Sequence, residues 1–367
     1  MVEAKKELEE KIGEKVLKDL EKGENPYLDI PIRSLSNVEY DEKTGTLRLK
    51  EEKSGKRFFF HTGHAKKFMQ TMLVSAFCKE LIDQGLHTSL RDLYYALKTT
   101  LPNSAENTFN EQSESDPIII DLEVALKILR EQLHLSADVR GRVVGNVTIR
   151  DRGNLINWAK LGSGGWAIPS NVEDIKFKKV DADFILVVEK NAAFERLNED
   201  KFWQKHNCII LTTQGQAARG ARRLIQRLAT EFEKLKVYVF TDADPYGWYI
   251  YFVIKYGSIS LAHVSESLGT PNAKFLGLTI SDIYEKDEEG NDLQNYTIKA
   301  EEVDIKRAQE MLNYEWIKKS PAWQKELELM IKKKIKAELE ALSGRGLKFM
   351  TEEYLPQKLK EEKNLLD

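Results

Sequence analysis

The chain has few cysteines and no long apolar run. Its 367 residues include two cysteines, Cys78 and Cys208, which excludes a disulfide framework and a four-cysteine zinc site. Both lie in apolar runs, so we expect two buried thiols. No stretch approaches the ~20 apolar residues of a membrane-spanning helix, and residues 1–24 lack the apolar core of a signal peptide. We therefore expect a cytoplasmic protein with no membrane partner.

An excess of positive charge is also absent. The 56 lysines and arginines are balanced by 59 aspartates and glutamates, which gives a formal net charge of -3. Many nucleic-acid-binding proteins are basic overall, so only local basic clusters would support DNA binding here. The sequence contains no Gly-x-x-x-x-Gly-Lys-Ser/Thr loop for a nucleotide. At ~100 to 200 residues per domain, the length predicts two or three domains.

The first half of the chain has the order of a winged helix-turn-helix. Apolar residues recur at helical spacing in three segments, and Ser89 followed by Asp92 indicates the start of a further helix. Three helices followed by a β-hairpin is a common nucleic-acid-binding arrangement, although the order alone is weak evidence. The expected helices cover residues 1–24, 68–83, a segment from 88 and 122–133; the expected strands lie in 30–61 and 143–149, and 103–116 is an expected exposed loop.

The second half of the chain alternates buried strands with helices. Continuous apolar runs of strand length are typical of parallel strands buried on both faces. We therefore predict an α/β fold with a parallel, Rossmann-like sheet covered by helices on both faces. A charged helical region, 301–367, follows, and its Trp/Leu/Ile stripe should pack on the sheet or on a partner. The expected strands are 184–188, 208–211, 237–240 and 275–278, with helices over 192–204, 217–235 and 245–256.

Acidic residues follow two of these strands. Glu189 comes after the first, and Asp242 and Asp244 come after the third. If the strand continues through Asp244, the two aspartates project on the same side, and Pro245 suits the first position of a helix. Ligands gather at the carboxyl ends of parallel strands, and an oxygen-rich site there favours Mg²⁺. The alternative is helix capping, which we favour for a lone Glu189 but not for Glu189 together with the Asp-x-Asp pair of another strand.

Other polar residues give weaker signals. His61 and His64 are three residues apart without a nearby cysteine or carboxylate, which favours an exposed turn over a zinc site. On a helix, Arg91 and Tyr95 share a face while Tyr94 points about 100° away. A phenol has an ordinary pKa of about 10 and needs a nearby cation, metal or base to act as a nucleophile. From the local sequence alone, an ordinary helix with one core and one rim tyrosine is the favoured interpretation.

Three motifs together resemble one family. In chain order they are Ser89-Leu90-Arg91-Asp92-Leu93-Tyr94-Tyr95, Val187-Val188-Glu189-Lys190 and Thr241-Asp242-Ala243-Asp244-Pro245-Tyr246-Gly247. This pattern resembles the A subunit of DNA topoisomerase VI, a family that includes the meiotic double-strand-break proteins. A basic stretch, Gly215 to Arg223, is similar to the family's, but it has Ala217 where proline is usual and Ala221 where threonine is common.

The resemblance implies a winged-helix (CAP-like) domain and a Toprim domain. Tyr95 matches the nucleophile that attacks a DNA phosphodiester and stays attached to the 5′ phosphate, and Arg91 matches the arginine beside it. Glu189 and Asp242 match the principal magnesium ligands, and Asp244 matches the second aspartate of the Toprim pair. We expect an N-terminal extension at 1–67, a winged-helix domain at 68–150 and a Toprim domain with C-terminal helices at 151–367. The roles of Asp92 and Lys190 stay open.

The resemblance also implies partners. In the family, the tyrosine and the metal of one site come from different protomers of an A-subunit homodimer. A separate ATPase B subunit would drive strand passage through double-stranded DNA, giving an A2B2 complex associated with the nucleoid. Two arginine groups are expected to contact DNA phosphates, with a solvated helix face as the alternative for Arg222 and Arg227. The expected contacts are Arg140, Arg142, Arg150, Arg152, Arg219 and Arg223.

The sequence thus predicts the DNA-cleaving subunit of a type IIB topoisomerase, an isomerase. One alternative is a break-forming protein that does not pass strands. Another is a Toprim nuclease or primase-like enzyme that uses only the acidic cluster, although a primase would normally need a zinc-binding cysteine set. A third is a DNA-binding scaffold without catalysis.

Overall fold

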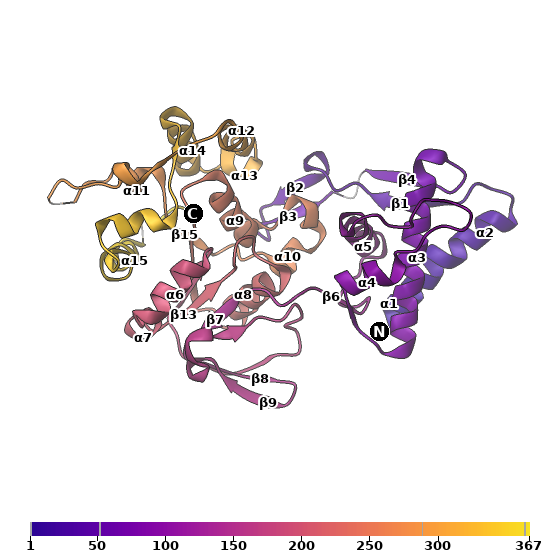
Figure 1. Cartoon of the computed structure of the whole chain (residues 1–367), viewed down its shortest axis with the longest axis horizontal. Helices are drawn as coiled ribbons and strands as arrows, with labels where there is room; N and C mark the ends of the chain where they lie inside the picture. Colours follow the sequence, from indigo (N-terminus) through magenta and orange to yellow (C-terminus); the bar gives the residue numbers. More distant parts are fainter. Residues whose placement is uncertain (1, 51–52, 288, 363–364) are drawn as a thin grey trace. The chain divides into compact units, whose positions relative to one another are not determined.

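The computed structural model describes residues 2–50, 53–287, 289–362 and 365–367 (Figure 1). The chain divides into two compact units, which are described separately. Unit 1 comprises Met1–Val38, Leu49–Asp138 and Ile259–His263, and unit 2 comprises Glu39–Arg48, Val139–Ser258 and Val264–Asp367. Among the described helices, none is long and apolar enough to cross a membrane.

Unit 1 is mainly helical. Its long helix α3 packs against α4, α5 and the N-terminal helices, and two antiparallel strands, β1 and β4, lie beside α3 and α5. The core contains Phe68, Leu93 and Cys78, whose burial raises its thiol pKa to about 12. The elements are α1 (Val2–Leu8), a π-helical turn (Glu9–Glu14), α2 (Lys15–Glu21), β1 (Tyr27–Pro31), β4 (Ser54–Phe58), α3 (Thr62–Gln84), β5 (Thr88–Ser89), α4 (Leu90–Leu97), α5 (Gln112–Leu126) and β6 (Leu135–Ser136).

The first helices of unit 1 follow the sequence pattern closely, and the helix expected at 122–133 is the exception. Gly85 ends α3 in the left-handed conformation, at φ 67°, which glycine adopts without strain. The expected third helix at 122–133 is wrong at both ends, because α5 runs from Gln112 to Leu126. It contains Pro117, and the polar residue Ser115 is fully buried in what was expected to be an exposed loop.

Unit 2 is built on a six-stranded sheet with the order β10-β7-β13-β12-β14-β15. Its four parallel strands confirm the predicted α/β architecture, and they begin and end within one or two residues of the expected positions. The strands are β12 (Phe184–Val188), β13 (Cys208–Thr212), β14 (Lys236–Phe240) and β15 (Lys274–Gly277), with β7 (Arg142–Val144) antiparallel to β13 and β10 (Trp166–Ala167) antiparallel to β7. Cys208 is also buried, as expected.

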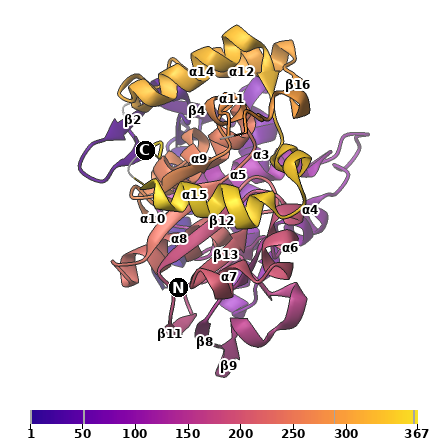
Figure 2. The ribbon, with the colours of Figure 1, turned by 90° about the vertical axis from the view of Figure 1, so that its left-hand side faces the viewer.

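Helices cover both faces of this sheet. The chain leaves β12 through α6 (Asn191–Glu199) and α7 (Phe202–Lys205) towards β13, then returns through α8 (Arg219–Glu231) to β14, on the other side of β12. Because such crossovers are right-handed, α6 and α8 lie on opposite faces, and α9 (Pro245–Tyr256) follows β14 on the face of α8. Figures 1 and 2 show α6, α7 and α15 (Leu355–Lys360) together on one face. The helices that follow the neighbouring strands β12 and β14 therefore lie on opposite faces, and in open α/β sheets this is the position at which ligands bind.

The strands expected to form the wing belong to unit 2. Residues 142–144 form β7 within the six-stranded sheet, and β8 (Val147–Asp151) is the centre of a three-stranded sheet with β9 (Asn154–Asn157) and β11 (Lys176–Val180). The strands expected at 143–149 are present, but they do not belong with the helices of unit 1, because Val143 and Val144 are buried against β13 of unit 2. The expected boundaries at 67/68 and 150/151 fall inside α3 and β8, respectively.

The C-terminal helices complete unit 2. Trp323 on α14 is fully buried and contacts Trp248 of α9 and Phe275 of β15, with ring centroids 5.8 and 4.9 Å away. The expected apolar stripe therefore packs within the unit. The other α-helices and strands are α10 (Ser265–Leu268), α11 (Ile280–Tyr284), β16 (Ile298–Lys299), α12 (Glu302–Met311), α13 (Glu315–Lys318), α14 (Pro321–Lys333), β17 (Ile335–Lys336) and a two-stranded sheet of β2 (Val38–Asp41) and β3 (Thr46–Leu49), whose residues 39–48 group with unit 2.

Candidate active site

Helix α4 carries the tyrosine pair of unit 1. It begins after Ser89, whose side-chain oxygen accepts the backbone N–H of Asp92 and whose hydroxyl donates to the Asp92 carboxylate. This cap fixes where the helix begins. The Asp92 carboxylate takes part in it by accepting the Ser89 hydroxyl, so Asp92 has a structural role. The buried side of α4 carries Leu93 and Tyr94, and the exposed side carries Arg91 and Tyr95. The predicted division of faces is therefore observed.

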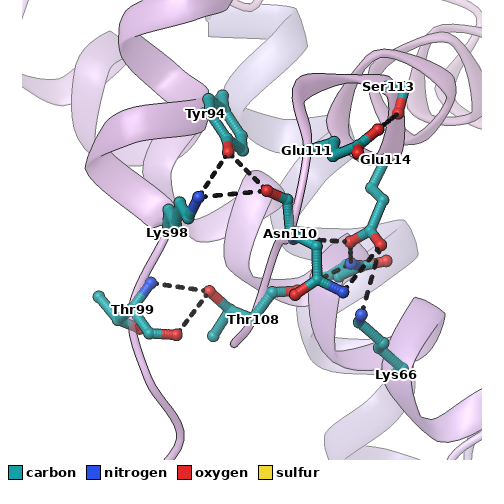
Figure 3. Close-up of polar contacts among 10 residues, drawn as sticks. Lys66, Tyr94, Lys98, Thr99, Thr108, Asn110, Glu111, Ser113 and Glu114 are labelled. Carbon is teal, nitrogen blue, oxygen red and sulfur yellow. Dashed lines mark hydrogen bonds and ion pairs between the residues drawn. The ribbon is translucent and has the colours of Figure 1, made fainter. Parts of the chain in front are cut away.

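Tyr94 is held in place by hydrogen bonds. It is 7% exposed, and its hydroxyl donates to the backbone oxygen of Asn110 at 2.8 Å. The Lys98 ammonium donates to the same hydroxyl at 2.9 Å and to the Asn110 oxygen at 3.1 Å (Figure 3). Glu114, which is paired with Lys66, accepts the Asn110 backbone N–H and so fixes the segment that receives Tyr94. The hydroxyl of Tyr94 thus already has both a donor and an acceptor.

Tyr95 has the opposite environment. It is 59% exposed, although its ring still lies 5.0 Å from that of Tyr94, centroid to centroid. The exposed guanidinium of Arg91 precedes it by one helical turn on the same face. Of the two phenols, Tyr95 is the one that an external phosphate can reach.

The acidic residues of unit 2 gather at the carboxyl ends of the neighbouring strands β12 and β14. Glu189 follows β12 directly, and its Oε2 accepts the backbone N–H of Asp242 at 3.3 Å. The strand does not continue through Asp244, because β14 ends at Phe240, so the condition for Asp242 and Asp244 to project on one side of a strand is not met. Asp244 instead caps α9, accepting the N–H groups of Tyr246 and Gly247 at 2.9 and 2.7 Å. Pro245 occupies the first turn of that helix, as predicted.

Gly247 allows this arrangement. A Cβ atom at this position would lie 2.6 Å from the backbone oxygen of Asp242, closer than real side chains come. Only glycine lets the start of α9 pass so near to the strand end. The Asp-x-Asp-Pro-x-Gly sequence is thus explained by the turn that it builds, which brings Asp242 and Asp244 to one strand end.

Burial and mutual repulsion disfavour the charged forms of these carboxyl groups. Burial raises the pKa of Glu189 to about 7, and the negative charge of Asp242 adds to the rise. Burial likewise raises the pKa of Asp242 to about 6, although Lys190 and the Leu339 N–H favour its charged form. Burial raises the pKa of Asp244 as well, against its two backbone donors. Negative charge is concentrated here beyond what the local cations neutralise.

Lys190 and the C-terminal region complete the cluster, and sequence reasoning missed these contacts. The Lys190 ammonium lies 2.9 Å from the Asp242 carboxylate and also contacts Glu338 and Glu340, at 3.1 and 2.8 Å. The Leu339 N–H donates to Asp242 at 2.8 Å. In the described part of the chain, no three acidic, histidine or cysteine side chains converge closely enough to hold a metal ion as they stand. A cation entering the cluster would therefore compete with Lys190 for Asp242.

The acidic cluster should destabilise the metal-free chain. Replacing Glu189 with glutamine is expected to raise the free energy of unfolding by about 1 to 3 kcal/mol at pH 8, since about 1.4 kcal/mol accompanies each unit of pKa. The pKa of Glu189 is near 7 in the folded chain against an ordinary 4.5, so the folded state binds more protons between these values. The free energy of unfolding of the wild-type chain should therefore fall as the pH rises from about 4.5 to about 7.

Urea denaturation in EDTA at pH 5 and pH 8 would measure the effect. The difference between Glu189→Gln and the wild type should shrink towards pH 5. Glu233→Gln, which neutralises an exposed carboxylate of the same unit, serves as the control and should change little. A Glu189→Gln chain that is less stable than the wild type at pH 8 would contradict the expectation.

The arginines expected to contact DNA separate into two classes. Some have structural partners: Arg223 binds both oxygens of Glu173, at 2.5 and 2.9 Å, and lowers the pKa of that carboxyl. Arg142 contacts Glu195 at 2.6 Å and lies over the Phe194 ring. Arg219 is 9% exposed. The other class is exposed and consists of Arg140, Arg150 and Arg152. Of these, Arg140 also donates to the backbone oxygen of Gln214 at 3.1 Å.

Comparison with known proteins covers nearly the whole chain. Among family models, residues 66–135 match type IIB DNA topoisomerase, residues 140–181 match the all-beta domain in DNA topoisomerase VI alpha subunit, and residues 184–359 match the Toprim domain of Spo11 and of the topoisomerase 6 A subunit. A Pyrococcus horikoshii protein is 47% identical over 366 residues, covering 97% of this chain and 94% of that protein. Proteins of Methanocaldococcus jannaschii and Halobacterium salinarum are 38% and 35% identical, covering 97% and 95% of this chain and 94% of each relative. All three are named as the A subunit of type 2 DNA topoisomerase 6.

Proposed function

The chain belongs to the family of DNA topoisomerase VI A subunits, and from this premise we propose that it cuts both strands of DNA through Tyr95. As a member of that family it is an isomerase. One observation carries the choice of nucleophile. Tyr94 is buried with its hydroxyl bonded to Lys98 and Asn110, whereas Tyr95 is exposed beside Arg91.

The chemistry is an exchange of one phosphate ester for another. The oxygen of Tyr95 attacks the phosphorus and gives up its proton, the P–O3′ bond breaks, and the 3′ oxygen leaves and takes up a proton. The 5′ phosphate remains on the tyrosine. Because a phosphodiester bond is kept, attack by the 3′ hydroxyl reseals the strand without ATP. The Arg91 cation would neutralise negative charge that develops on the phosphate oxygens.

We assign Mg²⁺ to Glu189, Asp242 and Asp244. The donors fit that ion because all are carboxylate oxygens close to the ends of two adjacent strands. Their pKa values are raised first by burial, which disfavours the charged forms, and a bound cation would offset that cost. When bound, magnesium would polarise the scissile phosphate and stabilise the charge of the displaced oxygen. Lys190 would then leave Asp242 and remain paired with Glu338 and Glu340.

Partners follow from the same proposal. Cutting a duplex requires two nucleophilic tyrosines, so two copies of the chain would act together as a homodimer, with the tyrosine and metal of one site supplied by different protomers. Strand passage would take its energy from ATP hydrolysed by a B subunit, in an A2B2 complex on cytoplasmic, nucleoid DNA.

A covalent-adduct assay tests this function. The chain, an ATPase B subunit, supercoiled DNA, Mg²⁺ and a nucleotide are incubated and then denatured, and protein attached to 5′ DNA ends is measured. A Toprim nuclease would cut without attachment, and a scaffold would do neither. Adduct formation without relaxation or decatenation would identify a break-forming protein that does not pass strands.

The two classes of arginine should respond differently to mutation. The Arg150→Gln/Arg152→Gln double variant is expected to weaken duplex binding roughly uniformly across DNA sequences. The slope of log K for binding against log salt concentration should fall in magnitude by up to about 2, because each lost phosphate contact removes about 1 from it. Arg223→Gln should instead destabilise the fold by about 0.5 to 1 kcal/mol, since it removes the partner of a half-exposed carboxylate, Glu173.

Fluorescence anisotropy at several salt concentrations and urea denaturation would measure the two effects. The converse pattern, with the salt slope changed only in Arg223→Gln, would contradict this assignment of DNA contacts.

A further inference from the structure

Unit 1 contains a cationic cavity away from the tyrosine pair. The cavity has a volume of about 440 Å³, which is within the range of small-ligand sites. It lies between β1, β4, the start of α3 and α5. Its walls contain four permanently cationic side chains and one carboxylate, and the charged and histidine residues among them are Arg33, Lys56, Arg57, His64, Lys67 and Asp121.

Asp121 organises the two arginines. It is 4% exposed, and its Oδ1 accepts hydrogen bonds from Nε and Nη2 of Arg33 at 3.1 and 2.7 Å. Its other oxygen binds Nη2 of Arg57. One buried carboxylate therefore serves two guanidinium groups and neutralises only one of their charges. The Nη1 atom of Arg57 is enclosed and has no hydrogen-bond acceptor within the described residues.

The other cations are not needed to hold Asp121. Lys67 is exposed at the start of α3, and Lys56 is exposed on β4, above the ring of Tyr27. The His64 Nδ1 accepts the backbone N–H of Phe58 at 3.3 Å, which leaves the proton of a neutral imidazole on Nε2 as a donor. The cavity therefore presents hydrogen-bond donors and positive charge beyond what the fold requires.

We propose that this cavity binds a phosphate-bearing ligand. The guanidinium of Arg33 is held by Asp121 and by the backbone oxygens of Pro117 and Ser260, so it contributes positive charge to the cavity. The exposed ammonium groups of Lys56 and Lys67 supply donors for phosphate oxygens. Ile30, Pro31 and Ile32 give the cavity an apolar edge beside the cations. Phosphate beside an apolar group is the chemistry of a nucleotide, whether it is free or part of a DNA strand. The site does not depend on cleavage by Tyr95.

Calorimetry tests the proposal by measuring how tightly pyrophosphate binds to the purified full-length chain. The Lys56→Gln/Lys67→Gln variant, which leaves the Arg–Asp121 pairs intact, should bind pyrophosphate at least tenfold more weakly. Lys22→Gln, which removes an exposed lysine of the same unit outside the cavity, should bind as the wild type does. Circular dichroism would verify that both variants are folded.

Two further probes identify the source of the phosphate. Displacement of pyrophosphate by ADP but not by a short duplex assigns the site to a free nucleotide, and displacement by the duplex assigns it to the DNA backbone. Absence of pyrophosphate binding, or equal binding by the double variant, would overturn the proposal. So would equally strong binding of an Asp/Glu-rich peptide, which would instead identify an acidic protein partner. Adduct formation in the cleavage assay is a separate readout, so failure of one proposal leaves the other testable.

Discussion

Replacing Tyr95 with phenylalanine is expected to reduce covalent protein–DNA adducts on the order of 10³-fold or more, because the attacking oxygen is removed. The fold should be unaffected, since the side chain is 59% exposed. Adducts would be counted after denaturation in the presence of the B subunit, Mg²⁺ and a nucleotide, with duplex binding measured in parallel. Binding should persist when adducts are lost.

Tyr94→Phe is the matched control. It removes a buried hydroxyl that donates to Asn110 and accepts from Lys98, so it should lower the free energy of unfolding by about 1 kcal/mol. It should nevertheless retain adduct formation. An adduct that survives in Tyr95→Phe, or that disappears in a folded Tyr94→Phe chain, would show that the nucleophile was assigned to the wrong tyrosine.

The second large effect is expected at the acidic cluster. Asp242→Asn should lower the rate of DNA cleavage about 10²- to 10⁴-fold, by analogy with the loss of an electrostatic group that acts on the transition state. It should also weaken Mg²⁺ binding, which calorimetry measures without reference to activity. Asparagine retains one oxygen to accept the Leu339 N–H, so the local fold should persist.

The control is Glu233→Gln, which neutralises an exposed carboxylate of unit 2 and should leave cleavage and magnesium affinity unchanged. If Asp242→Asn bound Mg²⁺ as tightly as the wild type, Asp242 would not be a ligand. If it bound the ion weakly but cleaved at the normal rate, the ion would have no role in cleavage.

Strand prediction succeeded where the pattern depends on burial alone. Strands β12 and β13 are buried at every position, so their sequences are continuous apolar runs that need no knowledge of their neighbours. The placement of the strands at 143–149 could not be predicted, for the opposite reason. A short strand such as β7 carries no information about which sheet it joins, and pairing with β13 placed it in unit 2.

The acidic site was also predictable only in part. The order Glu189, Asp242, Asp244 indicated a cluster because parallel strands end at one edge of a sheet. Its remaining contacts come from residues about 150 positions away, because Lys190 pairs with Glu338 and Glu340. The pairing of Arg223 with Glu173 was equally hidden, since a charged helix face looks the same whether it meets a carboxylate or water.

The sequence by itself determined the parallel α/β sheet, the family resemblance and the small set of residues able to carry the chemistry. These features are local, because strand burial, helix periodicity and short motifs are written in adjacent positions. Only the tertiary structure decided which of two adjacent tyrosines is exposed, which arginines are already paired, and that Asp121 gathers two arginines beside a cavity. Each of those outcomes depends on contacts between distant segments, and burial and charge compensation there are properties of the folded chain.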